Sequence, residues 1–125
     1  MIEQWLNELK SDPRAGEVGM YLIHNGVVRA TSRATVREGR RDVGKVTGLM
    51  LSYDADKAEA AVCDALNMPG IVFVRYHIFE GNLKVGDDMM YVLVAGDIRP
   101  HVMEALNILV GRLKSECVTE TELFE

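Results

Sequence analysis

Basic side chains gather in one short stretch of a chain that is otherwise acidic. Residues 29–45 carry six cations against Glu38 and Asp42, a balance of +4, whereas residues 46–125 carry six cations and 13 carboxylates, a balance of −7. The six cations are Arg29, Arg33, Arg37, Arg40, Arg41 and Lys45. Such a cluster suits a phosphate or a partner's carboxylate, because guanidinium groups make charge-assisted hydrogen bonds to both. A solvated loop explains the same pattern equally well.

Further candidate side chains lie at the two ends of a predicted helix. Lys114 at its carboxyl end is a candidate cation for an anionic ligand, or could be a solvated lysine that complements the helix dipole. Arg99 precedes a proline, so its guanidinium and the first free amides could hold one phosphate, unless its aliphatic stem packs along the surface. His101 beside it is the one histidine to which we assign a candidate role. His24 and His77 lie within predicted strands, where structural histidines are more common.

Hydrophobic spacing predicts the elements that must position these side chains. The predicted helices cover residues 2–10, the segment from Asp54 or Asp56 to Leu66, and the segment from Pro100 to Lys114. The predicted strands cover residues 18–30, 46–53, 71–79, 89–96 and 117–124. This order favours an α+β fold in two layers, with helices packed against a mostly antiparallel sheet.

Several segments carry more specific expectations. Asn25, followed by glycine, predicts a bulge or turn that interrupts the strand over 18–30. Residues 31–45 lack an apolar period and predict a surface loop. The segment 71–79 is apolar enough to be the central strand of the sheet, and residues 80–88 predict a turn that leads into an antiparallel neighbour.

The composition is that of one globular domain over residues 1–125, with 48% hydrophobic and 26% charged residues. No apolar run approaches the roughly 20 residues that span a bilayer, and the amphipathic N-terminus is unlike a secretory signal, so we expect a cytoplasmic protein. The net charge of −5 argues against nonspecific binding to nucleic acid. Cys63 and Cys117 lie far apart and predict buried structural thiols, with no metal or redox site.

Five short motifs, in a fixed order, resemble the large subunit of molybdopterin synthase. They are H-N-G-V-V-R at 24–29, L-S-Y-D at 51–54, H-I-F-E-G-N-L-K-V-G-D at 77–87, V-A-G-D-I-R at 94–99 and L-K at 113–114. The resemblance covers nearly the whole chain from Gly19. It implies an α/β-hammerhead fold, a homodimer, and a ubiquitin-like small subunit whose C-terminal thiocarboxylate enters the active site.

The same resemblance implies a reaction and the residues that perform it. In this family two sulfurs replace oxygen functions of cyclic pyranopterin monophosphate, and that step needs no metal or redox cofactor. Lys114 matches the catalytic lysine beside the small subunit's terminus, and Arg99 and Arg29 match arginines that bind the substrate. Further candidates for substrate binding are His101, Arg33, Arg40 and Arg41, the last three if the basic stretch folds over the pocket.

Two positions depart from the family pattern. The family usually has a His-Arg pair at the start of the last helix, where this chain has Ile98 before Arg99. A second family lysine, about seven residues after Lys114, is replaced by Thr121. Loss of one active-site cation can remove a few kcal/mol of transition-state stabilisation. The alternatives are therefore a noncatalytic homologue that binds a pterin or another phosphorylated ligand, and, outside the family, a ferredoxin-like ligand-sensing domain.

Overall fold

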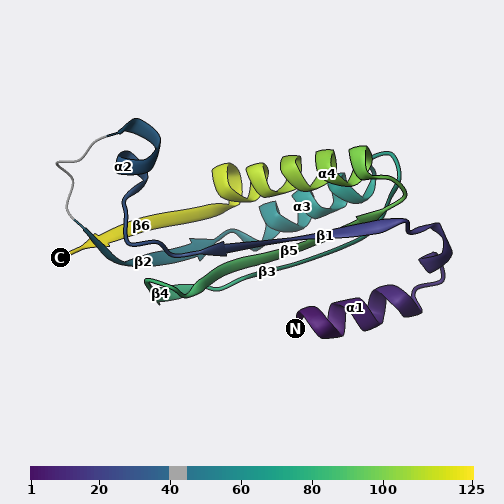
Figure 1. The fold of residues 1–125 in the computed structure, drawn as a ribbon, viewed down its shortest axis with the longest axis horizontal. Helices are drawn as coiled ribbons and strands as arrows, with labels where there is room; N and C mark the ends of the chain where they lie inside the picture. Colours follow the sequence, from purple (N-terminus) through teal and green to yellow (C-terminus); the bar gives the residue numbers. More distant parts are fainter. Residues whose placement is uncertain (40–44) are drawn as a thin grey trace.

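Long strands and flanking helices give the molecule an elongated shape (Figure 1). The computed structural model describes residues 1–39 and 45–125. The helices are α1 (Ile2–Ser11), α2 (Arg33–Glu38), α3 (Ala55–Leu66) and α4 (Arg99–Arg112), with a 3-10 turn at Ala15–Glu17 and a π-helical turn at Leu113–Cys117. The strands are β1 (Met20–Val27), β2 (Val46–Tyr53), β3 (Ile71–Ile78), β4 (Gly81–Lys84), β5 (Asp88–Gly96) and β6 (Val118–Phe124). Within the described ranges, no helix is long and apolar enough to cross a membrane.

The strands form two antiparallel sheets of three strands each. Their orders are β1-β5-β3 and β4-β2-β6. The α+β class and the antiparallel pairing of β3 with β5 are confirmed, but the sequence predicts one sheet with β3 at its centre. The prediction of the central strand is wrong, because β5 occupies that place and β3 lies at an edge.

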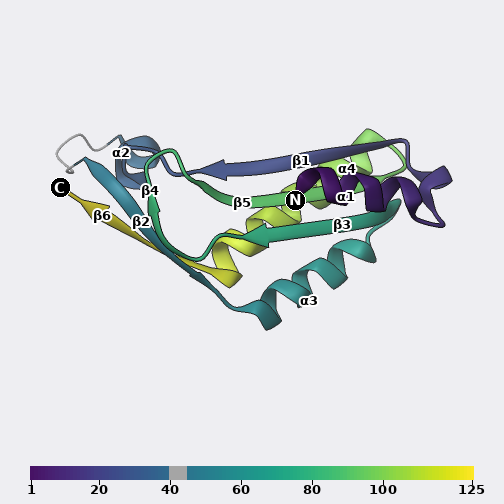
Figure 2. The ribbon, with the colours of Figure 1, turned by 90° about the horizontal axis from the view of Figure 1, so that it is seen from below.

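The apolar sequence of β3 has a different physical cause. Figures 1 and 2 show α3 and α4 on one face of the β1-β5-β3 sheet and α1 on the other. Phe73 belongs to the cluster of Trp5 and Leu9 from α1, whereas Val74 and Ile78 belong to the core beneath α3 and α4. A strand that is covered on both faces loses its polar alternation, even at the edge of a sheet.

Long-range contacts explain the two elements that the sequence does not predict. Residues 33–38 form α2 within the predicted loop, and the backbone N–H of Arg33 donates a hydrogen bond to the Glu122 carboxylate of β6 at 3.0 Å. The predicted turn contains β4, in which Leu83 pairs with Leu49 of β2. These partners lie far away in the sequence, so local propensity could not indicate them. β1 runs without a break through Asn25, and its irregularity follows Gly26.

The helix α3 packs through small side chains and is capped by Asp54. The Asp54 carboxylate accepts a hydrogen bond from the Lys57 amide at 3.1 Å, which settles the choice between Asp54 and Asp56. The predicted alanine face is buried, but Leu66 at its end is 41% exposed. Of the two cysteines predicted to be buried, Cys117 is buried and Cys63 is exposed, because Cys63 lies on the outer face of this helix.

The Asp54 cap gives a stability prediction with a control on the same helix. Asp54→Ala leaves the Lys57 amide without its acceptor, and it should lower the free energy of unfolding by about 1 kcal/mol. Asp56→Ala removes a carboxylate from the same turn but no cap, so a smaller change is expected. Chemical denaturation followed by circular dichroism measures both, and equal losses would contradict the assignment of the cap.

Candidate functional site

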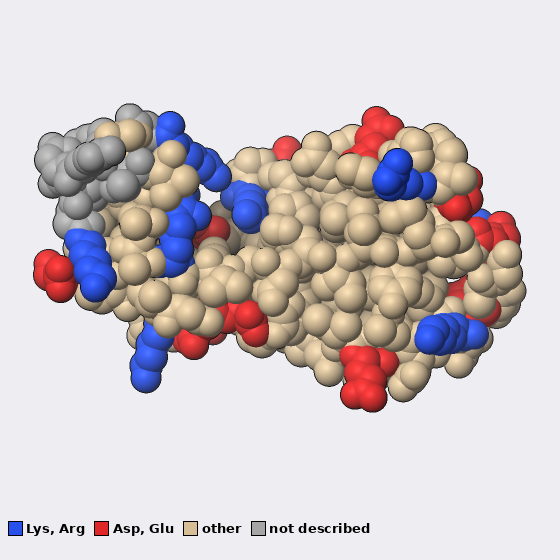
Figure 3. Space-filling model, in the orientation of Figure 1, with Lys and Arg blue, Asp and Glu red and all other residues tan. Residues whose placement is uncertain are grey.

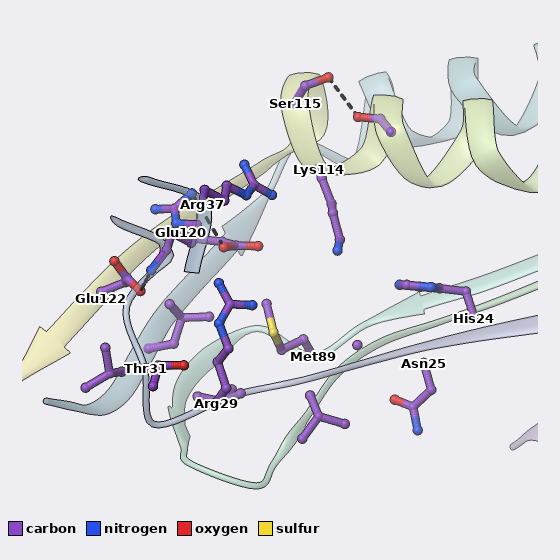
Figure 4. A pocket seen from close by; sticks show the side chains of 17 residues that line it. His24, Asn25, Arg29, Thr31, Arg37, Met89, Lys114, Ser115, Glu120 and Glu122 are labelled. Carbon is purple, nitrogen blue, oxygen red and sulfur yellow. Dashed lines mark hydrogen bonds and ion pairs between the residues drawn. The ribbon is translucent and has the colours of Figure 1, made fainter. Parts of the chain in front are cut away.

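An open cavity of about 660 Å³ lies where the carboxyl end of α4 meets β1 (Figure 4). Residues of α2, β2 and β6 complete its walls. Its ionisable side chains are His24, Arg29, Arg33, Arg37, Lys114, Glu120 and Glu122. Figure 3 shows Lys and Arg side chains on both sides of a hollow between the α2 end of the molecule and the helix layer. The fold thus brings part of the basic stretch next to the last helix.

Lys114 reaches the cavity from the π-helical turn that follows α4. Leu113 and Cys117 of this turn are buried, which leaves Lys114 and Ser115 on the outer side. The Ser115 hydroxyl donates to the Gly111 carbonyl at 2.8 Å and so satisfies an acceptor in the widened turn. Single π-helical turns are frequent at functional sites. Here the turn contains the predicted catalytic lysine, which lines the cavity.

Arg29 approaches Lys114 from the opposite wall. Figure 4 shows the Arg29 guanidinium and the Lys114 ammonium extending into the same space. Both side chains belong to exposed residues, so an anionic ligand can reach them from solvent. Two cations on facing walls suit a ligand with more than one anionic group, such as a phosphate and a thiocarboxylate held side by side.

Two glutamates of β6 form an acidic wall of the same cavity, Glu120 and Glu122. The Arg33 guanidinium lies 3.8 Å from the Glu120 carboxylate, whose side chain is only 14% exposed. Glu122 accepts the hydrogen bond from the Arg33 amide. Arg33 therefore lies in the cavity as predicted, but part of its charge is already neutralised. Glu120 and Glu122 were not among the predicted site residues, although the alternation of the last strand places both on one face.

Thr121 lies between these glutamates and does not line the cavity. Thr121 is exposed, and its partner in the β2–β6 pairing is Met50 of β2, which is also exposed. The position that matches the family's second lysine therefore faces away from Lys114. The cation is missing from this wall, and carboxylates occupy the neighbouring positions that do face the cavity.

His24 is the site residue that sequence reasoning missed. It lines the cavity from β1, and its Nε2 is buried without a hydrogen-bond partner among the described residues. Burial, and secondarily the charge of Lys114, lower the pKa of His24 below its ordinary value of 6.5. The expectation of a satisfied structural histidine is wrong at this atom. The one feature of the sequence that could have indicated this role is the spacing of His24 and Gly26, which places both residues on the same face of β1.

The structure does not bring Arg99 and His101 to this cavity. Both lie in the first turn of α4, and at about 1.5 Å per residue Arg99 is about 22 Å and His101 about 20 Å from Lys114 along the helix. The Asp97 carboxylate lies 2.7 Å from Nδ1 of His101, and this hydrogen bond is the main reason that the pKa of Asp97 is lowered. The Asp97 carboxylate also accepts a hydrogen bond from the Ile98 amide at 2.6 Å. A phosphate bound by Arg99 at this helix start would meet that carboxylate.

The remaining predicted residues have simpler outcomes. Arg40 and Arg41 lie outside the described residues. Arg37, the other described arginine of the basic stretch, lines the cavity from α2. Across residues 1–39 and 45–125, no group of three or more His, Cys, Asp or Glu side chains could hold a metal ion.

The described residues form a two-sheet α+β fold with a cationic cavity beside a π-helical turn, and such a cavity suits an anionic ligand. Comparison with protein families assigns residues 2–116 to the family described as MoaE protein. The chain therefore belongs to the MoaE family, the large subunits of molybdopterin synthase, and the resemblance drawn from the five motifs is confirmed. This family acts in molybdenum cofactor biosynthesis. No curated protein sequence matches the chain.

Solved structures share the fold at low sequence identity. Molybdopterin synthase from Staphylococcus aureus is 16% identical, with a TM-score of 0.70 over 87% of this chain and 77% of that one. Molybdopterin cofactor biosynthesis protein E from Burkholderia multivorans is 18% identical, with a TM-score of 0.71 over 100% of this chain and 82% of that one. A complex of subunits 1 and 2 of molybdopterin-converting factor from Helicobacter pylori is 15% identical, with a TM-score of 0.67 over 99% of this chain and 79% of that one.

Proposed function

We propose that this chain is the catalytic large subunit of a molybdopterin synthase, and that it transfers sulfur from a small-subunit thiocarboxylate to cyclic pyranopterin monophosphate. Membership of the MoaE family supports the reaction. The observation that carries the residue assignment is the convergence of Lys114 and Arg29 on one cavity from distant parts of the chain. Residues 1–125 would act as one domain, in the cytoplasm.

The proposed roles follow from the charges of the reactants. The pterin substrate carries a phosphate, and the small subunit presents an anionic thiocarboxylate. Arg29, together with Arg33 and Arg37, would hold anionic groups of the substrate, and Lys114 would orient the thiocarboxylate. Lys114 would also stabilise the negative charge that develops on oxygen as sulfur replaces it, since a cation placed beside a developing oxyanion lowers its energy.

The proposed partner is a ubiquitin-like small subunit with an extended C-terminus. The Helicobacter pylori structure is a complex of two subunits of molybdopterin-converting factor, and its fold matches 99% of this chain. In this chain the cavity is open to solvent beside the exposed Lys114, so an extended C-terminal segment could enter it. A reconstitution with the small subunit tests this part directly, because Lys114→Ala should spare complex formation and prevent turnover.

A homodimer is the remaining part of the proposal. Arg99 and His101 are too far from Lys114 to contact the same small substrate within one chain. If all three bind one substrate, the first turn of α4 must come from a second copy. A symmetric dimer repeats any such contact, so it would contain two equivalent sites, each built from both chains.

The acidic wall favours the alternative function of a noncatalytic ligand-binding homologue. Glu120 and Glu122 line the cavity where a further cation would assist the reaction, and Thr121 faces away. Under this alternative the chain binds a pterin or another phosphorylated ligand and forms no product. Mixing the chain with the thiocarboxylated small subunit and cyclic pyranopterin monophosphate separates the two functions, because only the synthase yields a dithiolene.

The acidic wall leads to a prediction for anion binding. Glu120→Gln removes a carboxylate that neutralises Arg33, so the affinity for inorganic phosphate should rise about fivefold, which corresponds to about 1 kcal/mol. Thr121→Lys is the matched control, since it adds a cation on the opposite face of β6 and should leave the affinity nearly unchanged. Isothermal titration calorimetry measures both. Tighter binding in Thr121→Lys than in Glu120→Gln would contradict the assigned faces of β6.

A further inference from the structure

The imidazole of His24 and the ammonium of Lys114 face one another across the inner part of the cavity. Figure 4 shows the His24 ring extending from β1 and the Lys114 side chain descending from the turn after α4 into the same space. After burial, the charge of Lys114 is the second cause that lowers the pKa of His24 among the residues that the structure describes. The two side chains therefore interact electrostatically, although they come from opposite walls.

The His24 Nε2 has an unused hydrogen-bonding capacity. It is buried, and none of the described residues provides a partner for it. A buried polar atom without a partner is unfavourable, and such atoms call for a specific explanation. Gly26 adjoins this nitrogen, and a Cβ at that position would lie 3.8 Å from Nε2, at ordinary van der Waals contact. The neutral imidazole can offer an acceptor here, and an ammonium is a strong donor.

The charges around His24 favour its neutral form. Arginines from the segment after β1 and from α2, Lys114 from the turn after α4, and glutamates from β6 line the same cavity, while β5 contributes the uncharged Met89. The charged groups are Arg29, Arg33, Arg37, Lys114, Glu120 and Glu122. Cations outnumber carboxylates, and Arg33 already engages the carboxylates. A proton on His24 would add a charge to a cationic site, which is unfavourable.

We propose that His24 is a positioning residue for Lys114, whose ammonium donates a hydrogen bond to the neutral imidazole and is thereby held over the inner end of the cavity. This inference rests on the proposed function for its consequence, since a fixed ammonium is one that can orient the thiocarboxylate. The flexible four-carbon stem of lysine lets the ammonium change position within the cavity. Lys114 keeps two further N–H donors for anionic groups.

The proposal fixes the direction of the pH dependence. The neutral form of His24 is the acceptor, and its pKa lies below 6.5 in the folded protein. Activity should therefore be complete above this value and should fall as the pH drops through the lowered pKa of His24, where protonation removes the acceptor and repels Lys114. The acidic limb of the kcat profile should lie below pH 6.5.

The first experiment measures the pKa of His24 by NMR titration in the wild-type chain and in Lys114→Ala. The pKa of His24 should rise in Lys114→Ala, because both the positive charge and the donor are removed. His77 is the internal control: it lies in an edge-to-face contact with Phe79 and does not line the cavity, so its ring signals should be the same in both chains. An unchanged pKa for His24 would overturn the proposal. This readout does not require turnover, so it decides the inference even if the chain proves noncatalytic.

The second experiment compares variants that separate the acceptor from the ring. His24→Phe keeps a ring without an acceptor, and kcat should fall about tenfold at neutral pH, with KM changed less and the acidic limb lost. His24→Gln keeps an acceptor that does not titrate, so it should recover most of the rate and be insensitive to acid. His24→Phe should still fold, because it keeps a ring at this position and leaves no polar side-chain atom buried there. A wild-type pH profile in His24→Phe would refute the role, and product formation by the wild-type chain would still uphold the proposed function.

Discussion

Lys114→Ala should lower kcat for dithiolene formation by about 100-fold or more, while the small subunit still binds. A fixed cation beside a developing oxyanion contributes roughly 3 to 4 kcal/mol, and loss of the ammonium removes this stabilisation from the transition state. The change should fall mainly on kcat, because the arginines of the basic stretch remain to bind the substrate phosphate. The variant should fold, since Lys114 is exposed and the turn is anchored by the buried Leu113 and Cys117.

The matched control for this variant is Lys10→Ala. Lys10 is an exposed lysine of α1, on the opposite face of the β1-β5-β3 sheet from α4. The Lys10→Ala variant loses the same charge far from the cavity, so its kcat should equal that of wild type. Steady-state kinetics with saturating small subunit measures both variants. Equal rates in Lys114→Ala and wild type would remove Lys114 from the reaction.

Mixing two inactive variants should restore activity if each site uses both chains of a dimer. Arg99→Ala and Lys114→Ala should each be severely impaired, because every site in either homodimer lacks one cation. A mixed dimer contains one site with both cations and one with neither. Random exchange of subunits in an equal mixture should therefore recover about one quarter of the wild-type rate. This is a large effect, because the two unmixed variants provide almost no background.

The doubly substituted chain controls for the act of mixing. When the chain that carries both Arg99→Ala and Lys114→Ala is mixed with either single variant, no site contains both cations. The rate should therefore stay at the level of the single variants. Native mass spectrometry confirms that subunits exchange. If subunits exchange and the rate does not recover, Arg99 does not complete the Lys114 site. The Arg99 side chain would then act only at the start of its own α4, beside Asp97.

Local patterns predicted those elements whose stability is itself local. The helix α3 carries the Asp54 cap, α4 carries Pro100 in its first turn, each has its own apolar face, and both form where the sequence indicates. By contrast, α2 depends on Glu122 and β4 depends on β2, so neither is visible in a short window. The apolar strand β3 was misplaced because burial on both faces resembles a central position.

The candidate site was predictable where its residues belong to motifs. Arg29 and Lys114 match the family pattern, and the structure places both at one cavity. Glu120 and His24 could not be assigned in this way. The role of Glu120 depends on how β6 meets α2, and that of His24 on how β1 meets the turn after α4. For His24 the deciding fact is the absence of a partner for Nε2 among the described residues, and no sequence pattern reveals an unsatisfied atom.

The fate of the small subunit's sulfur tests the central claim most directly. The wild-type chain is incubated with cyclic pyranopterin monophosphate and a small subunit whose thiocarboxylate carries labelled sulfur, under single-turnover conditions. Labelled sulfur should pass to the pterin as the thiocarboxylate becomes a carboxylate, and Lys114→Ala should leave the label on the small subunit. A stable complex of wild-type chain, small subunit and pterin in which all of the label stays on the thiocarboxylate would contradict the synthase assignment and establish a binding protein instead.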